Sequence, residues 1–157
     1  MILANKIAEI AQTQIGVRET SPNGGKEIAE YQRATWLPVG QWPWCAAFVD
    51  WVIMWAMQGG TWTFPRPRTA AAWDLERWCR SVDNSAKLHK PAPTVKRGDI
   101  VIYTFSHVGI AVSDADKDGW VKTVEGNTNG EGSREGDGVY LKRRHRSKIR
   151  SIIRFTV

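Results

Sequence analysis

Four residues whose types could together perform nucleophilic catalysis occur along this sequence in the order cysteine, histidine, carboxylate and amide. The cysteine, Cys45, follows Pro43 at the start of an apolar segment that ends at Gly59-Gly60. Proline in the first turn and glycine past the last turn are typical of helix ends. A helix N-terminus stabilises a thiolate through its partial positive charge. Cys45 is therefore a candidate nucleophile, although a free cysteine is more often a small buried hydrophobe.

The histidine and the carboxylate lie on two predicted strands that flank an Asp-rich turn. If the turn is centred on Asp116, antiparallel pairing places His107 opposite Glu125, with the two Cβ atoms about 5 Å apart. Asn127 then shares their face, although a slip of one residue would break this arrangement. A carboxylate that orients a histidine completes a Cys–His–acid site.

The elements that would position these residues form an α+β fold. Apolar residues at helical spacing predict helices first and β-branched runs predict strands after residue 85. The segment 43–60 is apolar almost all round, which predicts a buried helix. It is shorter than the roughly 20 residues of a membrane span, and Asp50 interrupts it. We expect one domain over 1–157, as a monomer, with helices at 2–16, 26–34, 43–60 and 69–82 packed on a C-terminal antiparallel sheet.

The net charge of +6 and the pI near 9.6 favour an anionic partner, and Lys142–Arg150 is the most basic stretch. Nucleic acid, a membrane surface and an acidic wall polymer all fit that charge. Because no base-stacking or groove-reading motif accompanies the basic run, we expect no nucleic-acid partner. The second cysteine, Cys79, fits an apolar helical stripe and is interpreted as structural.

Four segments of the sequence resemble the CHAP family of peptidoglycan hydrolases, which are relatives of the NlpC/P60 peptidases. They are Pro43-Trp-Cys-Ala-Ala-Phe-Val, Gly98-Asp-Ile-Val-Ile, His107-Val-Gly-Ile-Ala-Val and Glu125-Gly-Asn127. The resemblance implies a papain-like fold and amide cleavage in the bacterial cell wall. It also implies Cys45 as nucleophile, His107 as base, and Glu125 and Asn127 as the orienting acid and amide.

The residues just before Cys45 depart from the pattern of the family. Many members carry glutamine directly before the cysteine, whereas here Trp44 stands at that position and Gln41 lies four residues upstream. We expect the Cys45 N–H, with Gln41, to stabilise an oxyanion. Trp42 and Trp44 flank the nucleophile and either line the cleft or pack in the core.

The Asp-rich turn also fits a calcium-loop pattern, through Asp114, Asp116 and Asp118 followed by Glu125. A calcium-binding EF-hand needs helices on both sides of the loop, and both flanks here are predicted strands. We therefore expect a polar turn, no metal and no cofactor, with Ca²⁺ bound by the three aspartates as the alternative.

The N-terminus lacks the basic and apolar regions of a secretory signal. We therefore expect synthesis in the cytoplasm and action in the periplasm or cell wall. We also expect no separate wall-binding domain. Together these expectations are typical of a compact phage endolysin. A secreted antibacterial toxin, an autolysin, and an inactive module that binds wall or nucleic acid are the alternatives. Contact with an anionic wall or outer-membrane surface is expected from the basic run. Muramoyl-alanine amidase and stem-peptide or cross-bridge endopeptidase activities both remain open.

Overall fold

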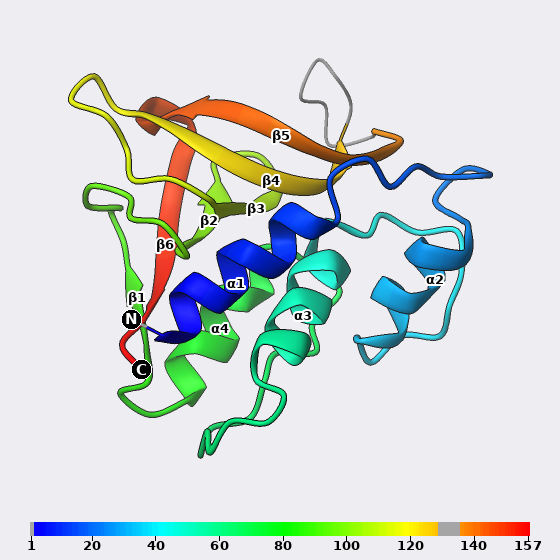
Figure 1. Cartoon of the computed structure of the whole chain (residues 1–157), viewed down its shortest axis with the longest axis horizontal. Helices are drawn as coiled ribbons and strands as arrows, with labels where there is room; N and C mark the ends of the chain where they lie inside the picture. Colours follow the sequence, from blue (N-terminus) through cyan, green and yellow to red (C-terminus); the bar gives the residue numbers. More distant parts are fainter. Residues whose placement is uncertain (1, 129–135) are drawn as a thin grey trace.

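In the described residues, 2–128 and 136–157, the computed structural model has four helices followed by a six-stranded antiparallel sheet (Figure 1). The predicted α+β layout is thus confirmed. The helices are α1 (Ile2–Thr13), α2 (Lys26–Arg33), α3 (Cys45–Ala56) and α4 (Asp74–Ser81). The strands are β1 (Ala86–His89), β2 (Ile100–Tyr103), β3 (Val108–Ala111), β4 (Trp120–Thr128), β5 (Gly138–His145) and β6 (Ile149–Phe155), with the short 3-10 helix η1 (Arg146–Lys148) before β6. The strand order is β1-β6-β2-β3-β4-β5.

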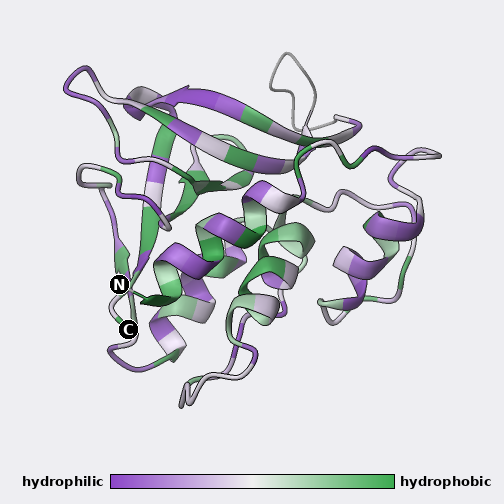
Figure 2. Ribbon diagram, in the orientation of Figure 1, coloured by the Kyte–Doolittle hydropathy of each residue, from purple (hydrophilic) through white to green (hydrophobic). Residues whose placement is uncertain are grey.

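Helix α3 lies at the centre of the helical layer and packs against α1, α2, β3 and β4. It is almost uniformly hydrophobic, whereas the outer side of α1 and much of β5 are hydrophilic (Figure 2). The composition of this helix predicts burial on every side. Trp55 is nevertheless 51% exposed, so one side of the helix reaches the surface. Of the helices in the described part of the chain, none combines the length and apolarity needed to cross a membrane.

The two faces of the sheet bury different sets of side chains, because successive residues of a strand point to opposite faces. Ile100 and Ile102 of β2 join the core that the helices cover. Val101 and Tyr103 of the same strand belong to a second cluster, together with Ala111, Val121 and Ile152. We call the face with this second cluster the outer face, and Glu125 lies on it because it alternates in step with Val121.

The predicted helix at 69–82 is shorter in the structure and begins at Asp74. The hydroxyl of Thr69 accepts a hydrogen bond from the N–H of Ala71 at 3.2 Å. This local turn occupies the side chain of Thr69, which would otherwise be able to cap a helix that begins at this position.

The hairpin between β3 and β4 has a register two residues away from the predicted one. Ile110 lies opposite Val124, whereas a turn centred on Asp116 would place it opposite Lys122. The turn closes between Asp116 and Trp120, where the Asp116 carboxylate accepts the N–H of Trp120 at 2.9 Å. A shift of two residues keeps every side chain on its predicted face.

Candidate active site

Cys45 is the first residue of α3 and is 7% exposed. The first hydrogen bond of the helical pattern runs from the Phe48 N–H to the Trp44 carbonyl, at 2.9 Å. The N–H groups of residues 45–47 precede that pattern and therefore remain available to a ligand. Cys45 thus combines a thiol with nearby amide donors that can bind an anion.

A cleft of about 500 Å³ opens above Cys45. Its other walls come from residues 36–37, 42–43 and 69–72, with Asp74 and Ser106. The thiol is therefore accessible to a substrate, even though most of the cysteine residue is buried.

Of the three residues predicted to support the cleft, only Trp42 lines it. Trp44 is fully buried, stacks on Tyr31 with 5.6 Å between ring centroids, and donates from Nε1 to Glu19 at 2.8 Å. The core interpretation of Trp44 therefore holds. Gln41 is exposed and lies outside the set of described residues that line the cleft, which argues against the predicted oxyanion role.

His107 directly precedes β3 and is fully buried. A tight turn holds its backbone, since its N–H donates to the Phe105 carbonyl at 2.6 Å and its carbonyl accepts from Tyr103 at 3.1 Å. Its Nε2 donates to Glu125 Oε1 at 2.8 Å. The structure thus brings His107 and Glu125 together, although through a diagonal rather than the directly opposed pairing that was predicted.

Because Nε2 is bound to Glu125, the second ring nitrogen of His107, Nδ1, is the one available to interact with Cys45. Nδ1 is buried and has no hydrogen-bond partner of standard geometry within residues 2–128 and 136–157. Burial lowers the pKa of His107, but interactions with Cys45 and Glu125 outweigh burial and raise this pKa to about 9. The histidine therefore holds its proton at neutral pH, between the Cys45 sulfur and the Glu125 carboxylate.

Glu125 lies on β4, fully buried on the outer face of the sheet. Burial raises the pKa of its carboxyl group, but Arg144 and His107 outweigh burial and hold the pKa well below its usual range. Gly109 makes room for this side chain, because a Cβ at position 109 would lie 2.6 Å from Glu125 Cγ. The carboxylate is therefore ionised and tightly placed beside His107.

Asn127 is fully buried and lies in a β-bulge between Glu125 and Thr128. Its φ of 55° is in the left-handed region, which asparagine tolerates better than most residues. The bulge interrupts the alternation of side chains along β4. Asn127 therefore does not simply repeat the orientation of Glu125 along a regular strand.

Three residues that hold Glu125 were not predicted as part of the site. Tyr103 and Thr123 donate from their hydroxyl groups to Oε2 at 2.7 and 2.6 Å. Arg144 donates from Nε to the same oxygen at 2.8 Å and from Nη2 to Oε1. Thr123 was detectable by its alternation with Glu125, whereas Arg144 lies within the basic run that the sequence assigns to the surface.

The three aspartates of the turn do not assemble into a metal site. Asp114 accepts the N–H of Arg97 at 2.9 Å, and Asp116 accepts the N–H groups of Asp118 and Trp120. Among the residues that the structure describes, no group of three or more histidine, cysteine, aspartate or glutamate side chains is arranged to hold a metal ion. The Asp116 carboxylate instead closes the β3–β4 turn, and the Asp114 carboxylate links this hairpin to the segment before β2.

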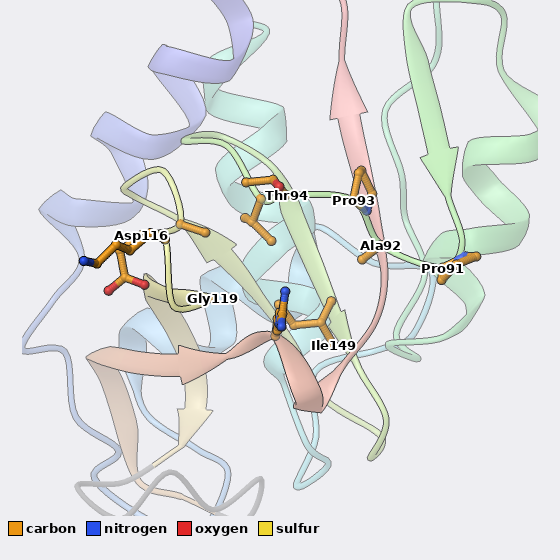
Figure 3. Close-up of a pocket in the computed structure, with 11 residues that line it drawn as sticks. Pro91, Ala92, Pro93, Thr94, Asp116, Gly119 and Ile149 are labelled. Atoms are coloured by element: carbon orange, nitrogen blue, oxygen red, sulfur yellow. The ribbon is translucent and has the colours of Figure 1, made fainter.

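A second hollow of about 500 Å³ lies between the loop at residues 91–95 and the β3–β4 turn (Figure 3). Pro91, Pro93 and Thr94 form one side of it, and Gly119 and Ile149 lie at the other. Cys45, His107 and Glu125 are all outside its lining. The cleft above Cys45 is therefore the candidate active site.

A helix-borne cysteine that faces a histidine–carboxylate pair on an antiparallel sheet is the arrangement of papain-like cysteine hydrolases. The CHAP domain family matches residues 38–127, which include Cys45, His107, Glu125 and Asn127. The chain therefore belongs to the CHAP family, whose members are cysteine-dependent amidases and peptidases that act on peptidoglycan.

Among solved structures, the chain is similar to the crystal structure of the wild-type endolysin LysIME-EF1, with a TM-score of 0.60 and 18% sequence identity. The match covers 98% of this chain and 64% of the endolysin chain. At this identity the likeness establishes a shared fold. The comparison with curated proteins found no match.

Proposed function

We propose that this chain hydrolyses an amide bond in the stem peptide or cross-bridge of bacterial peptidoglycan. The observation that carries the proposal is the placement of the His107–Glu125 pair beside Cys45 at the start of α3. Membership of the CHAP family supports peptidoglycan as the substrate.

The proposed reaction begins from an ion pair in which the thiol proton of Cys45 has been transferred to His107. The thiolate attacks the substrate carbonyl carbon, and the new C–S bond produces a tetrahedral oxyanion. The N–H of Cys45 stabilises this oxyanion, an interaction of the kind worth about 3–4 kcal/mol in other enzymes. His107 then protonates the departing amine as the C–N bond breaks. Neutral His107 takes a proton from the water that attacks the thioester, the C–S bond breaks, and the carboxylic acid leaves, which restores the Cys45 thiolate and the protonated His107.

We further propose that the enzyme serves host lysis by a phage. The likeness in fold to an endolysin supports this role, although that endolysin chain is longer. Expression in a bacterial cytoplasm, with and without an added export signal, tests the site of action. We expect lysis only with export, since peptidoglycan lies outside the membrane, whereas lysis in both strains would argue against the wall as the target.

Digestion of purified peptidoglycan tests the proposed activity and identifies the bond. We expect the protein to lower the turbidity of the suspension and to release soluble fragments whose masses show one added water per cleavage. Free stem peptides would identify an amidase, and fragments cut within the stem or bridge an endopeptidase. The absence of fragments from walls of several stem-peptide types would contradict the proposal.

The pH dependence of hydrolysis should have an alkaline limb near pH 9. Below that pH His107 keeps the proton that the departing amine needs, and above it the proton is lost, because the pKa of His107 is raised to about 9. The measurement is kcat/KM for a soluble muropeptide between pH 5 and pH 10.5. An alkaline limb near the ordinary histidine pKa of about 6.5 would contradict the proposed ion pair.

Gly109→Ala should lower kcat by about 10- to 100-fold, because small displacements of catalytic groups have effects of this size. The added Cβ would meet Glu125 Cγ and displace the carboxylate from His107. Gly59→Ala is the control, because it strains a backbone with φ of 74° but adds a Cβ that would meet no atom within 4 Å, so it reports loss of stability without displacement of Glu125. Equal kcat values for the two variants, measured below both unfolding temperatures, would refute the requirement for a close fit at Gly109.

A further inference from the structure

Glu125 has more hydrogen-bond donors around it than an orienting carboxylate requires. His107 occupies one position on Oε1, and Tyr103 and Thr123 bind Oε2. Arg144 spans both oxygens from the neighbouring strand β5, with Nε on Oε2 and Nη2 on Oε1. A two-pronged contact of this kind fixes the plane of the carboxylate as well as its charge.

The burial of this cluster makes the charge of Arg144 important. The Glu125 side chain is 0% exposed and that of Arg144 is 13% exposed. A buried carboxylate is stable in its ionised form only when opposite charge and hydrogen bonds replace the lost water. Arg144 supplies both, and it retains a positive charge at every pH at which the enzyme is tested.

Arg144 also contacts the two aromatic side chains that shortly precede His107 in the chain, Tyr103 and Phe105. Its guanidinium carbon lies 5.0 Å from the Tyr103 ring centroid and 5.6 Å from that of Phe105. Phe105 stacks on His107 with 5.8 Å between centroids. One side chain on β5 is thus in contact with both the carboxylate and the aromatic residues that confine the imidazole.

We propose that Arg144 is a positioning residue, which keeps Glu125 ionised and aimed at His107 so that the imidazolium faces Cys45. This inference rests on the proposed function, since it assigns Arg144 a part in the same reaction. Arg144 acts through Glu125, and it is not among the described residues that line the cleft above Cys45.

The ionisable groups that surround Glu125 allow the role of Arg144 to be tested by pH. They are His107 before β3, Tyr103 on β2 and Arg144 on β5, with Cys45 of α3 on the far side of His107. Burial raises the pKa of Tyr103, so its phenol stays protonated. Removal of the positive charge of Arg144 should therefore raise the pKa of Glu125, because His107 is then the one cationic partner left among the described residues that contact it.

The test compares Arg144→Gln with Arg143→Gln. Both substitutions remove one positive charge from β5, but Arg143 is exposed and stacks on Trp120, 4.2 Å from the ring centroid. We expect Arg144→Gln alone to lower kcat by about tenfold or more, as loss of a supporting partner does at metal-binding histidines. We also expect kcat/KM of Arg144→Gln, relative to the wild type, to fall further toward acidic pH, because its Glu125 becomes protonated at a higher pH.

Carboxyl-carbon NMR of Glu125 gives a readout that needs no substrate. In the wild type this signal should show no titration down to about pH 3, because the carboxyl pKa is held well below its usual range. In Arg144→Gln it should titrate at higher pH, and Arg144→Lys should restore the wild-type signal. If Arg144→Gln kept both the wild-type titration of Glu125 and the wild-type pH dependence of kcat/KM, the inference would be overturned and Arg144 would have a structural role.

The inference stays testable if Arg144→Gln does not fold. A lysine keeps the charge but makes a point contact in place of the two-pronged one. Arg144→Lys should then lower kcat relative to Arg143→Lys, and equal kcat values would overturn the inference. Failure of the wild type to cleave peptidoglycan would instead refute the proposed function, while the titration of Glu125 would still report on Arg144.

Discussion

Glu125→Ala is expected to lower kcat/KM by roughly 100-fold or more and the free energy of unfolding by about 3–5 kcal/mol. The loss of activity follows because His107 loses the acceptor that orients Nε2. The loss of stability follows because Arg144, whose side chain is 13% exposed, is left buried without its counterion. Denaturant unfolding and muropeptide kinetics on the same preparation measure the two effects.

Glu76→Ala is the matched control for Glu125→Ala. Glu76 is also buried, at 3% exposed, and it pairs with Arg150 at 3.0 Å in a different part of the fold. We expect this variant to lose stability but to keep the wild-type kcat/KM at temperatures where it is folded. A similar fall in kcat/KM for both variants would show that Glu125 acts through stability alone.

The stability difference between wild type and Glu125→Ala should itself depend on pH. The pKa of Glu125 is depressed in the folded state, so its ionised form contributes stability above the unfolded pKa of about 4.5. That contribution decreases as pH falls below this value toward the folded pKa. The two unfolding curves should therefore approach each other in acid, and a constant difference down to pH 2 would contradict the assignment.

The sequence predicts the layout of the fold well because its hydrophobic period changes from helical to alternating near residue 85. It also places Cys45 at the start of a helix, through the flanking proline and glycines. The pairing of His107 with Glu125 survives a register error of two residues, since an even shift preserves the face of a strand. An error of one residue would have separated the two side chains.

The parts of the site that could not be predicted depend on contacts between distant strands. Arg144 reaches Glu125 only because β5 pairs with β4, with Val121 opposite Arg144. In the sequence Arg144 is one of several cations in a run that is typical of a solvated surface. Trp44 adjoins the nucleophile in sequence, yet its ring is directed to Tyr31 and the core, which residue spacing alone does not reveal.

Cys45→Ala is expected to lower kcat by roughly 10³-fold or more, because loss of a nucleophile removes the covalent pathway. The substitution removes one sulfur atom, and the fold should therefore persist. Cys79→Ala is the matched control, since Cys79 is the other cysteine, is 3% exposed and lies in the core. Burial raises the pKa of the Cys79 thiol to about 11, so this cysteine remains a protonated thiol at neutral pH.

The rate at which these two variants release soluble fragments from purified peptidoglycan tests the central claim most directly. The measurement uses equal concentrations of folded wild type, Cys45→Ala and Cys79→Ala, with fragments quantified by mass spectrometry. We expect Cys79→Ala to release the same fragments as the wild type and Cys45→Ala to release almost none. Release of the same fragments by Cys45→Ala at a rate near that of the wild type would show that Cys45 is not the nucleophile.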